Sequence, residues 1–248
     1  YGPGLAPALW VGVNFARALS FLWDKPLIPV NHMAGHFYSA FLPKSRIKNF
    51  QFPVLALLVS GGHTELVLVS GHGKYRILGA TRDDAAGEAF DKVARILKLG
   101  YPGGPEIAKI AEAGIMNYES GVNIKLPRPM LASKNYDFSF SGLKTAVLYL
   151  VRDLTKKHSL ARMRPAIARE FQQAVVDVLV AKTLRAAQEF KVKTVILGGG
   201  VAANTLLRTA LLKKLKQEVP HSKLLIPDSA LCGDNALMIA LAAYFSGK

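Results

Sequence analysis

The chain has 248 residues, of which 50% are hydrophobic and 20% charged, a composition that excludes a disordered chain and allows one large domain or two small ones. No apolar run reaches the roughly 20 residues of a membrane span, and the first residues do not form a signal peptide. We therefore expect no membrane partner. The 32 lysines and arginines against 17 acidic residues leave a net charge of +15, which favours a polyanionic partner, nucleic acid first. The single cysteine, Cys232, excludes an intrachain disulfide and fits a reducing cytoplasm.

The first segment has apolar residues at helical spacing. Residues 4–23 predict an amphipathic helix, with Ala8, Gly12 and Ala16 forming a small-residue face that can admit a close neighbour. The alternative is that this face packs inside its own domain. Residues 26–30 predict a short strand.

Two histidines follow this predicted strand. His32 and His36 are four residues apart, so on a helix they share one face with Cβ atoms about 5–6 Å apart, and both rings can reach one ion. The alternative is a chance pair of surface histidines. The zinc-protease signature needs a glutamate directly after the first histidine, but Met33 stands there.

The next segment predicts a β-hairpin. Apolar runs at 54–59 and 65–69 flank the sequence Ser60-Gly61-Gly62. We expect Gly61 and Gly62 to supply positive φ angles and to present backbone N–H groups to an anion such as phosphate. An ordinary β-turn is the alternative.

A third strand at 74–80 and a helix at 85–97 follow. Asp83 or Asp84 is expected to cap this helix, and Asp91 on it can accept hydrogen bonds from ribose hydroxyls. The alternative for Asp91 is a solvated helix face. The glycine–proline turn at 101–105 opens a short helix, residues 117–136 are predicted to be irregular, and a further helix starts near 138. The basic segment 152–169 is either a contact for phosphate groups or a solvated helix face.

The last part predicts strand, glycine turn and helix. A long helix at 165–190 and a strand at 194–197 precede the glycines at 198–200, and a helix then runs to about 219, an arrangement typical of phosphate or nucleotide sites. The alternative hypothesis of a dinucleotide-binding fold is weak, because the next acid at a strand end, Asp228, lies too far along the chain. After a strand at 223–227, Asp234 precedes a final helix at 236–245, either as its N-cap or as a third ligand beside the histidines.

Taken together, six motifs resemble those of the tRNA threonylcarbamoyladenosine transferase family of the bacterial TsaD type. The resemblance implies an α/β actin-like fold, as in sugar kinases and heat-shock ATPases. Residues 1–50 would be a remnant of the first lobe carrying the histidines, and 51–248 a second lobe with a helical insertion at about 103–160. The motifs are VNHMAGH at 30–36, LLVSGGHTEL at 57–66, GEAFDKVARILKLGYPGGP at 87–105, FSFSGLKTAV at 138–147, LGGGVAAN at 197–204 and GDNALMIA at 233–240.

The resemblance also implies a site. Its metal ligands would be His32, His36 and Asp234, holding one divalent iron or zinc ion. Its contacts to the adenylate or ATP-type nucleotide would be Leu58, Val59, Ser60, Gly61, Gly62, Asp91, Gly104 and Asn204.

The implied reaction is transfer of a threonylcarbamoyl group from threonylcarbamoyl-adenylate to the exocyclic amine of the adenosine that follows the anticodon. No covalent nucleophile is expected, because the mixed anhydride is already activated. The implied partners are tRNA, a TsaB-type homologue as heterodimer partner and a TsaE-type ATPase, all in the cytoplasm.

The chain departs from the family pattern in two ways. Ala34 stands where the histidine motif usually has glutamate, which we expect to change the surroundings of the metal without removing it. The elements that open the first lobe in the family do not precede Tyr1, and the chain stops slightly early at Lys248. A truncated, catalytically silent paralogue that binds nucleotide and partner proteins is therefore an alternative function, and a metallopeptidase is a weaker one.

Overall fold

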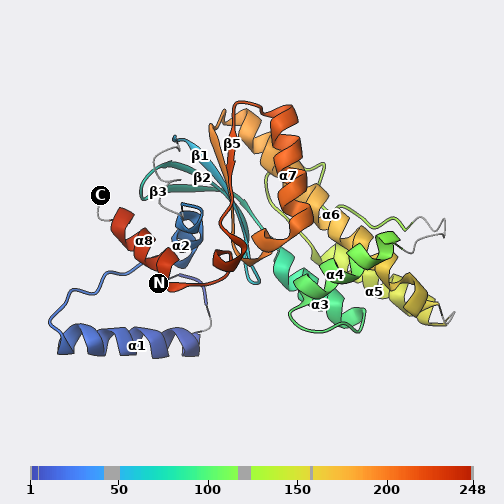
Figure 1. Ribbon diagram of the computed structural model, residues 1–248, viewed down its shortest axis with the longest axis horizontal. Helices are drawn as coiled ribbons and strands as arrows, with labels where there is room; N and C mark the ends of the chain where they lie inside the picture. Colours follow the sequence, from blue (N-terminus) through green and yellow to red (C-terminus); the bar gives the residue numbers. More distant parts are fainter. Residues whose placement is uncertain (1, 5, 42–50, 117–123, 157–158, 247–248) are drawn as a thin grey trace.

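The computed structural model describes residues 2–4, 6–41, 51–116, 124–156 and 159–246 (Figure 1). Its centre is a five-stranded sheet with the order β3-β2-β1-β4-β5. The first three strands form an antiparallel meander, and β4 and β5 run parallel to β1. The strands are β1 (Val54–Val59), β2 (Thr64–Gly71), β3 (Lys74–Ala80), β4 (Thr194–Gly198) and β5 (Lys223–Leu225).

The register of the central strands brings the two glycine turns to one edge of the sheet. β1 pairs with β4 from Val54 opposite Thr194 to Leu58 opposite Gly198. Because parallel strands end at the same edge, the turns that begin at residues 60 and 199 are neighbours. This edge carries the candidate site.

Two hydrophobic cores cover the two faces of the sheet, which explains why β1 is apolar and buried along its whole length. The larger core contains Leu55, Leu57 and Val195 of the sheet and the buried side chains of α3 to α7. The smaller core contains Ala56, Leu58 and the side chains of α2 and α8. The helices are α2 (His32–Ser39), α3 (Ala86–Ile96), α4 (Gly103–Met116), α5 (Ser141–Lys156), α6 (Leu160–Glu189), α7 (Thr205–Glu218) and α8 (Ala236–Ser246), with short 3₁₀ helices at Gly200–Ala203 and Ser229–Leu231.

Helix α1 (Ala6–Leu22) lies apart from the rest of the described chain (Figure 1). None of its residues is buried. Among the described helices, α1 included, none is both long enough and apolar enough to cross a membrane.

The strand predicted at 26–30 is wrong. These residues belong to no strand, and all but Val30 are exposed. Pro26 and Pro29 have no N–H to donate to a neighbouring strand, so a short apolar run is not sufficient to form a strand here.

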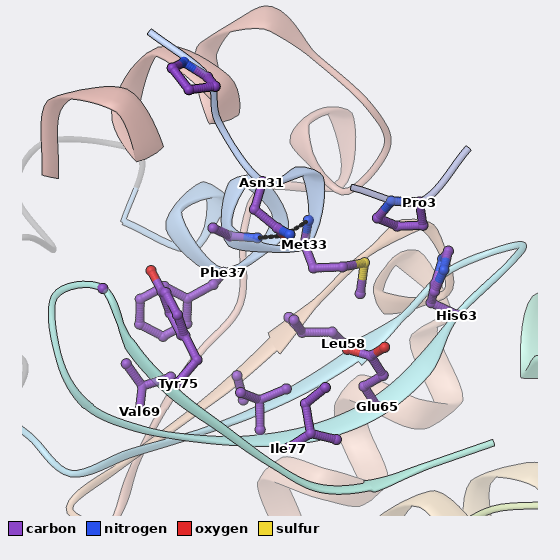
Figure 2. Close-up of a pocket in the computed structure, with 15 residues that line it drawn as sticks. Pro3, Asn31, Met33, Phe37, Leu58, His63, Glu65, Val69, Tyr75 and Ile77 are labelled. Carbon is purple, nitrogen blue, oxygen red and sulfur yellow. Dashed lines mark hydrogen bonds between the residues drawn. The ribbon is translucent and has the colours of Figure 1, made fainter. Parts of the chain in front are cut away.

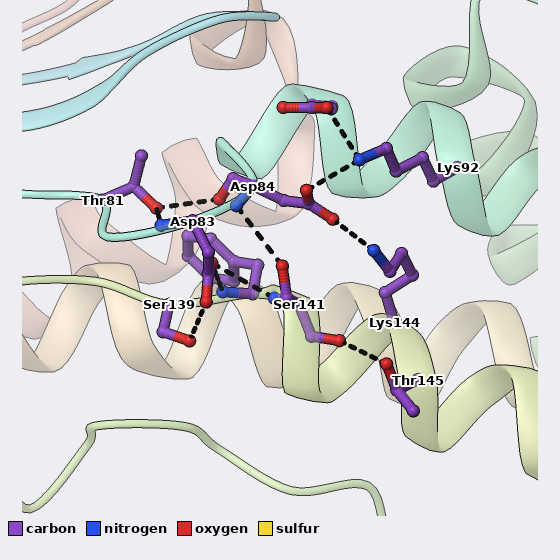
Figure 3. Close-up of polar contacts among 10 residues, drawn as sticks. Thr81, Asp83, Asp84, Lys92, Ser139, Ser141, Lys144 and Thr145 are labelled. Atoms are coloured by element: carbon purple, nitrogen blue, oxygen red, sulfur yellow. Dashed lines mark hydrogen bonds and ion pairs between the residues drawn. The ribbon is translucent and has the colours of Figure 1, made fainter.

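Asp83 and Asp84 do not cap α3, contrary to the prediction. The N-cap residue is Ala85, which forms no side-chain cap bond. The Asp83 carboxylate instead accepts hydrogen bonds from the backbone N–H groups of Phe140 and Ser141, at 2.8 and 3.2 Å (Figure 3). Asp83 therefore caps the start of α5, a helix more than fifty residues further along the chain.

The Asp84 carboxylate ties α3 to α5. Lys92 of α3 lies 2.7 Å from one carboxylate oxygen, and Lys144 of α5 lies 2.9 Å from the other (Figure 3). Burial alone would raise the pKa of Asp84, but the hydrogen bonds from Lys92 and Lys144 outweigh it and lower that pKa. This ion pair network fixes the helix that carries Asp91.

Candidate metal centre and nucleotide cavity

Helix α2 presents the two histidines. Asn31 caps it, because its side-chain oxygen accepts from the backbone N–H groups of Met33 (2.9 Å) and Ala34 (3.3 Å). His32 and His36 then lie one turn apart on one face, with ring centroids 4.8 Å apart.

The close packing of α2 against α8 brings Asp234 to this face. A Cβ atom at Gly35 would lie 3.1 Å from the side chains of Met238 and Ile239, so glycine permits the close approach. Asn235, not Asp234, caps α8 by accepting from the backbone N–H of Met238 at 2.9 Å. The Asp234 carboxylate is therefore available to face the histidines.

The three side chains form a compact donor set. Asp234 Oδ1 lies 3.3 Å from Nε2 of both His32 and His36, and all three ligand atoms lie within 4.8 Å of one another. Tetrahedral coordination with bonds of about 2.1 Å would place adjacent donors about 3.4 Å apart. The two distances from the carboxylate to the imidazoles match this value, which supports a site for one divalent metal ion.

The environment of His36 supports the same conclusion. Its side chain is only 1% exposed, yet within the described part of the chain neither ring nitrogen forms a hydrogen bond, and Nε2 has only the Asp234 carboxylate beside it at 3.3 Å. Burial, followed by the neighbouring His32, lowers the pKa of His36 despite the opposing effect of Asp234. A neutral imidazole with an unsatisfied buried nitrogen is the form that binds a metal.

The donor set opens onto a cavity of about 540 Å³. The Asp234 side chain is 73% exposed, so it faces open space and not the core. The remaining wall comes in equal part from the first glycine turn and from the N-terminal segment with the start of α1. The residues are Ser60, Gly61, Gly62 and His63 of the turn, Pro3, Gly4, Ala8 and Leu9 of the N-terminal segment, and Gly200 and Gly233.

A second cavity, of about 410 Å³, adjoins the first. Gly61 and Gly200 line both cavities. The metal centre and the second cavity thus adjoin at these two glycines, at one edge of the sheet. The other residues lining the second cavity include Phe90, Asp91, Gly104 and Asn204.

The glycines of the two turns differ in their φ angles and in the space around their Cα atoms. Gly199 has the positive φ, +89°, and a Cβ atom there would lie 2.3 Å from the carbonyl oxygen of Val59. The positive φ angles predicted for Gly61 and Gly62 are wrong, because Ser60 N–H bonds the His63 carbonyl (2.8 Å) across a turn with negative φ angles. A Cβ atom at Gly61 would meet nothing within 4 Å and would point into open space.

Asp91 and Asn204 are held in the cavity wall by bonds within the protein. Asp91 Oδ1 accepts from the backbone N–H of Gly103 at 2.8 Å. The Asn204 side chain caps α7 by accepting from Leu207 N–H (3.0 Å) and donates to Gln172 Oε1 (2.9 Å). Both side chains are therefore oriented before any ligand arrives.

Comparison with known proteins identifies the family. Residues 1–241 match the family model described as TsaD: tRNA N6-adenosine threonylcarbamoyltransferase. The chain belongs to this family. The TsaD family model thus accounts for nearly all of the chain, including His32, His36 and Asp234.

Curated TsaD relatives are about half identical to the chain. The tRNA N6-adenosine threonylcarbamoyltransferase of Geobacillus kaustophilus is 52% identical over 250 residues, covering 100% of this chain and 70% of the relative. That of Enterococcus faecalis is 48% identical over 248 residues, covering 100% of this chain and 68% of the relative. The chain therefore spans a little over two thirds of these relatives.

Solved structures confirm the predicted actin-like α/β fold class. T. kodakarensis HypF is similar with a TM-score of 0.62 at 15% identity, over 95% of this chain and 39% of HypF. A full-length HypF in the phosphate- and nucleotide-bound form gives a TM-score of 0.62 at 14% identity, over 90% of this chain and 36% of that protein. At such low identity the likeness concerns the fold alone.

The eight adenylate contacts implied by the TsaD resemblance do not all reach the cavities. Gly61, Asp91, Gly104 and Asn204 line the second cavity, and Ser60 and Gly62 line the cavity of the metal centre. The side chains of Leu58 and Val59 line neither, because both are buried in the two cores.

Leu58 faces a third cavity on the other side of β1. This groove, of about 530 Å³, lies between α2 and strands β1 to β3 and is lined by Met33, Phe37, Glu65 and Tyr75 among others (Figure 2). Burial raises the pKa of the Glu65 carboxyl, partly offset by His63. Any nucleotide contact from Leu58 or Val59 would have to come from the main chain.

The nucleotide contacts implied by the resemblance do not include two glycines of the site, Gly87 and Gly200. A Cβ atom at Gly87 would lie 2.5 Å from the carbonyl oxygen of Ser60, so only glycine lets α3 begin against the turn. Gly200 lines both cavities. The strand–glycine–helix pattern at 198–200 was the available signal for Gly200.

Proposed function

We propose that this chain transfers a threonylcarbamoyl group from threonylcarbamoyl-adenylate to the exocyclic amine of the adenosine next to the anticodon, in cytoplasmic tRNAs that read codons starting with adenine. The observation that carries the proposal is that the two cavities adjoin and share part of their lining. Gly61 and Gly200 line both, so one ligand can place its adenosine in one cavity and its activated acyl group beside the His32, His36 and Asp234 donor set.

The second cavity suits the adenosine part of the donor. Asp91 offers a carboxylate, fixed by Gly103, that can accept from ribose hydroxyls. Phe90 and Pro105 supply apolar wall for the base. Gly61 and Gly62 of the first turn and Gly199 and Gly200 of the second have no side chains to obstruct a phosphate approaching the backbone.

The donor set would hold one divalent iron or zinc ion. Two imidazoles and one carboxylate leave open coordination positions, and such an ion would supply Lewis-acid polarisation of the carbamoyl and phosphate oxygens. The orphaned nitrogens of His36 are the structural support for this assignment.

The chemical step is acyl transfer without a covalent enzyme intermediate. The adenosine amine attacks the carbamoyl carbon, a C–N bond forms, the C–O bond of the mixed anhydride breaks, AMP leaves and the amine loses a proton to solvent. The chain contributes by orienting the adenylate through Asp91 and the two turns.

The assignment is tested by His36→Ala, with exposed His221→Ala as the matched control. We expect the His36 variant to lose bound metal, measured by elemental analysis, and transfer to a tRNA transcript, with its thermal unfolding little changed. The His221 variant should keep both. Retention of metal and full transfer by the His36 variant would overturn the assignment.

We also propose a TsaB-type homologue as partner, bound through α1. The support is the set of large apolar side chains that α1 exposes, including Trp10, Val11, Phe15 and Phe21. A TsaE-type ATPase remains a prediction from the resemblance alone.

A further inference from the structure

Six exposed cations gather at the edge of the sheet where β1, β4 and β5 begin. This is the edge opposite the glycine turns. They come from separate parts of the chain and form what we call the basic edge. The basic edge consists of Lys74, Arg76, Lys191, Lys193, Lys216 and Lys223.

The strand register brings the central members together. Lys223 N–H donates to the carbonyl oxygen of Lys193 at 2.9 Å, and β4 pairs with β5 from Thr194 opposite Lys223. The Arg76 guanidinium lies 5.1 Å from the centroid of the Phe190 ring, which directly precedes Lys191. Residues distant in sequence therefore share one surface.

The ends of the basic edge are placed by a hairpin and by two helix ends. Lys74 starts β3 and pairs with Gly71 at the tip of the β2–β3 hairpin. Lys216 lies in the last turn of α7. The side chain of Gln188 donates to the carbonyl oxygen of Glu218 (3.4 Å), which joins the ends of α6 and α7 beside β5 (Figure 1).

The positive charge of the basic edge is not neutralised within the protein. In the described chain, none of its six cations forms an ion pair with a carboxylate. The two acids at the bordering helix ends are engaged elsewhere, Glu189 by the hydroxyl of Tyr136 and Glu218 by Lys214. Such a surface attracts a polyanion and releases its counterions.

The dimensions suit a nucleic-acid backbone. Four inter-strand steps of about 4.8 Å make the sheet edge about 19 Å wide, enough to contact several consecutive phosphates of a nucleic-acid backbone. Strands of five or six residues, at about 3.3 Å each, separate this edge from the glycine turns by roughly 17–20 Å.

We propose that the basic edge is the surface that binds the tRNA backbone, so that one tRNA contacts both this edge and the site at the opposite edge. This inference rests on the proposed function, which makes tRNA the substrate. It places the contact away from the segment 152–169 favoured by sequence. In that segment Arg164 and Arg169 are half-buried, and the exposed Asp153 adjoins Arg152.

Two triple variants with the same reduction in charge test the proposal. The first is Lys193→Gln with Lys216→Gln and Lys223→Gln. The second is Arg152→Gln with Lys156→Gln and Arg162→Gln, three exposed cations of α5 and α6. Affinity for a tRNA transcript is measured by fluorescence anisotropy over a salt series, and affinity for AMP by calorimetry.

We expect the basic-edge variant to bind tRNA at least ten-fold more weakly at about 100 mM salt. The slope of the logarithm of its affinity against the logarithm of the salt concentration should be reduced by about 0.7–0.9 for each phosphate that is no longer neutralised. The second variant should change less than about two-fold, and both should bind AMP as the unmodified chain does. Each single replacement, for example Lys193→Gln, should lower the slope by about 0.7–0.9 on its own, which keeps the test informative if the triple variant folds poorly.

Three results would overturn the proposal that the basic edge binds the tRNA backbone. They are equal losses of tRNA affinity in both triple variants, a larger loss in the second, or unchanged tRNA affinity in the basic-edge variant. If AMP and metal bind normally in that case, the proposed transferase site survives. If the unmodified chain binds no tRNA, both proposals fail.

Discussion

Helix α1 is exposed and helix α6 is largely buried, although α1 has the more apolar composition. α1 carries one charged residue, Arg17, among its 17 residues, yet none of the 17 is buried. α6 includes charged residues such as Arg169 and Lys182, and its buried positions run from Leu160 to Ala187. The more apolar helix is the exposed one.

The difference follows from what each helix can pack against. α6 lies in the larger core, where Phe171 meets Phe90 with ring centroids 5.1 Å apart. α1 meets no such surface within the described chain, and Phe21 is 91% exposed. We infer that α6 contributes mainly to stability and α1 mainly to recognition, because a large exposed apolar surface marks an interaction site.

The largest expected effect compares one phenylalanine from each helix. Phe171→Ala should lower the free energy of unfolding by about 3–5 kcal/mol, because it leaves a cavity in a packed core. Phe21→Ala should change it by less than about 0.5 kcal/mol. Urea unfolding measures both, and equal losses of stability would contradict the comparison.

A buried lysine of α6 extends the comparison of the two helices to the pH dependence of stability. Lys182 is 1% exposed and donates to Ser133 Oγ (2.8 Å) and the Asn135 carbonyl (3.0 Å). Burial, helped by Arg185 and opposed by Asp137, lowers the pKa of Lys182 to about 8. The unfolded chain then binds more protons between pH 8 and the ordinary lysine pKa of about 10.5, so stability should rise with pH in that window.

The expected gain from Lys182 is up to about 3 kcal/mol. Lys182→Met should remove this rise, whereas exposed Lys134→Met should follow the unmodified chain. Urea midpoints at pH 7, 9 and 10.5 measure the effect. A Lys182→Met profile that parallels the unmodified chain would show that the ammonium is not destabilised by burial.

The glycine turn at residues 60–62 should affect nucleotide binding and not the stability of the fold. Gly61→Val places a side chain in open space at the junction of the two cavities, and we expect AMP affinity to fall about ten-fold, or about 1.4 kcal/mol. Gly142→Val on α5, outside both cavities, is the control. Unchanged AMP affinity in Gly61→Val would remove the turn from the nucleotide site.

The smallest effect on stability belongs to Gly12 of α1. A Cβ atom there meets nothing within 4 Å, so Gly12→Phe should leave the urea midpoint almost unchanged. It should nevertheless abolish co-purification with a TsaB-type partner, if the small-residue face is the interface. Survival of that complex would move the interface elsewhere.

The local elements followed from sequence because their signals are short-range. The apolar run 54–59 and the segment 74–80 predicted strands that the structure has at Val54–Val59 and Lys74–Ala80. Periodicity and turn residues act within a few positions, so they identify such elements without knowledge of the fold. The order of six motifs likewise identified the family.

Only tertiary structure decided which distant groups meet. Nothing near Asp234 in sequence requires it to face His32 and His36; the close packing at Gly35 does so. Asp83 was expected to cap the helix that follows it and instead caps α5.

The basic edge has the same origin. Its cations are scattered from residue 74 to residue 223, and strand register together with the packing of the ends of α6 and α7 brings them to one edge. Sequence determined which side chains the chain carries and which local element holds each one. Their meeting depended on packing between elements, because contact energies between distant segments are realised only when the whole core forms.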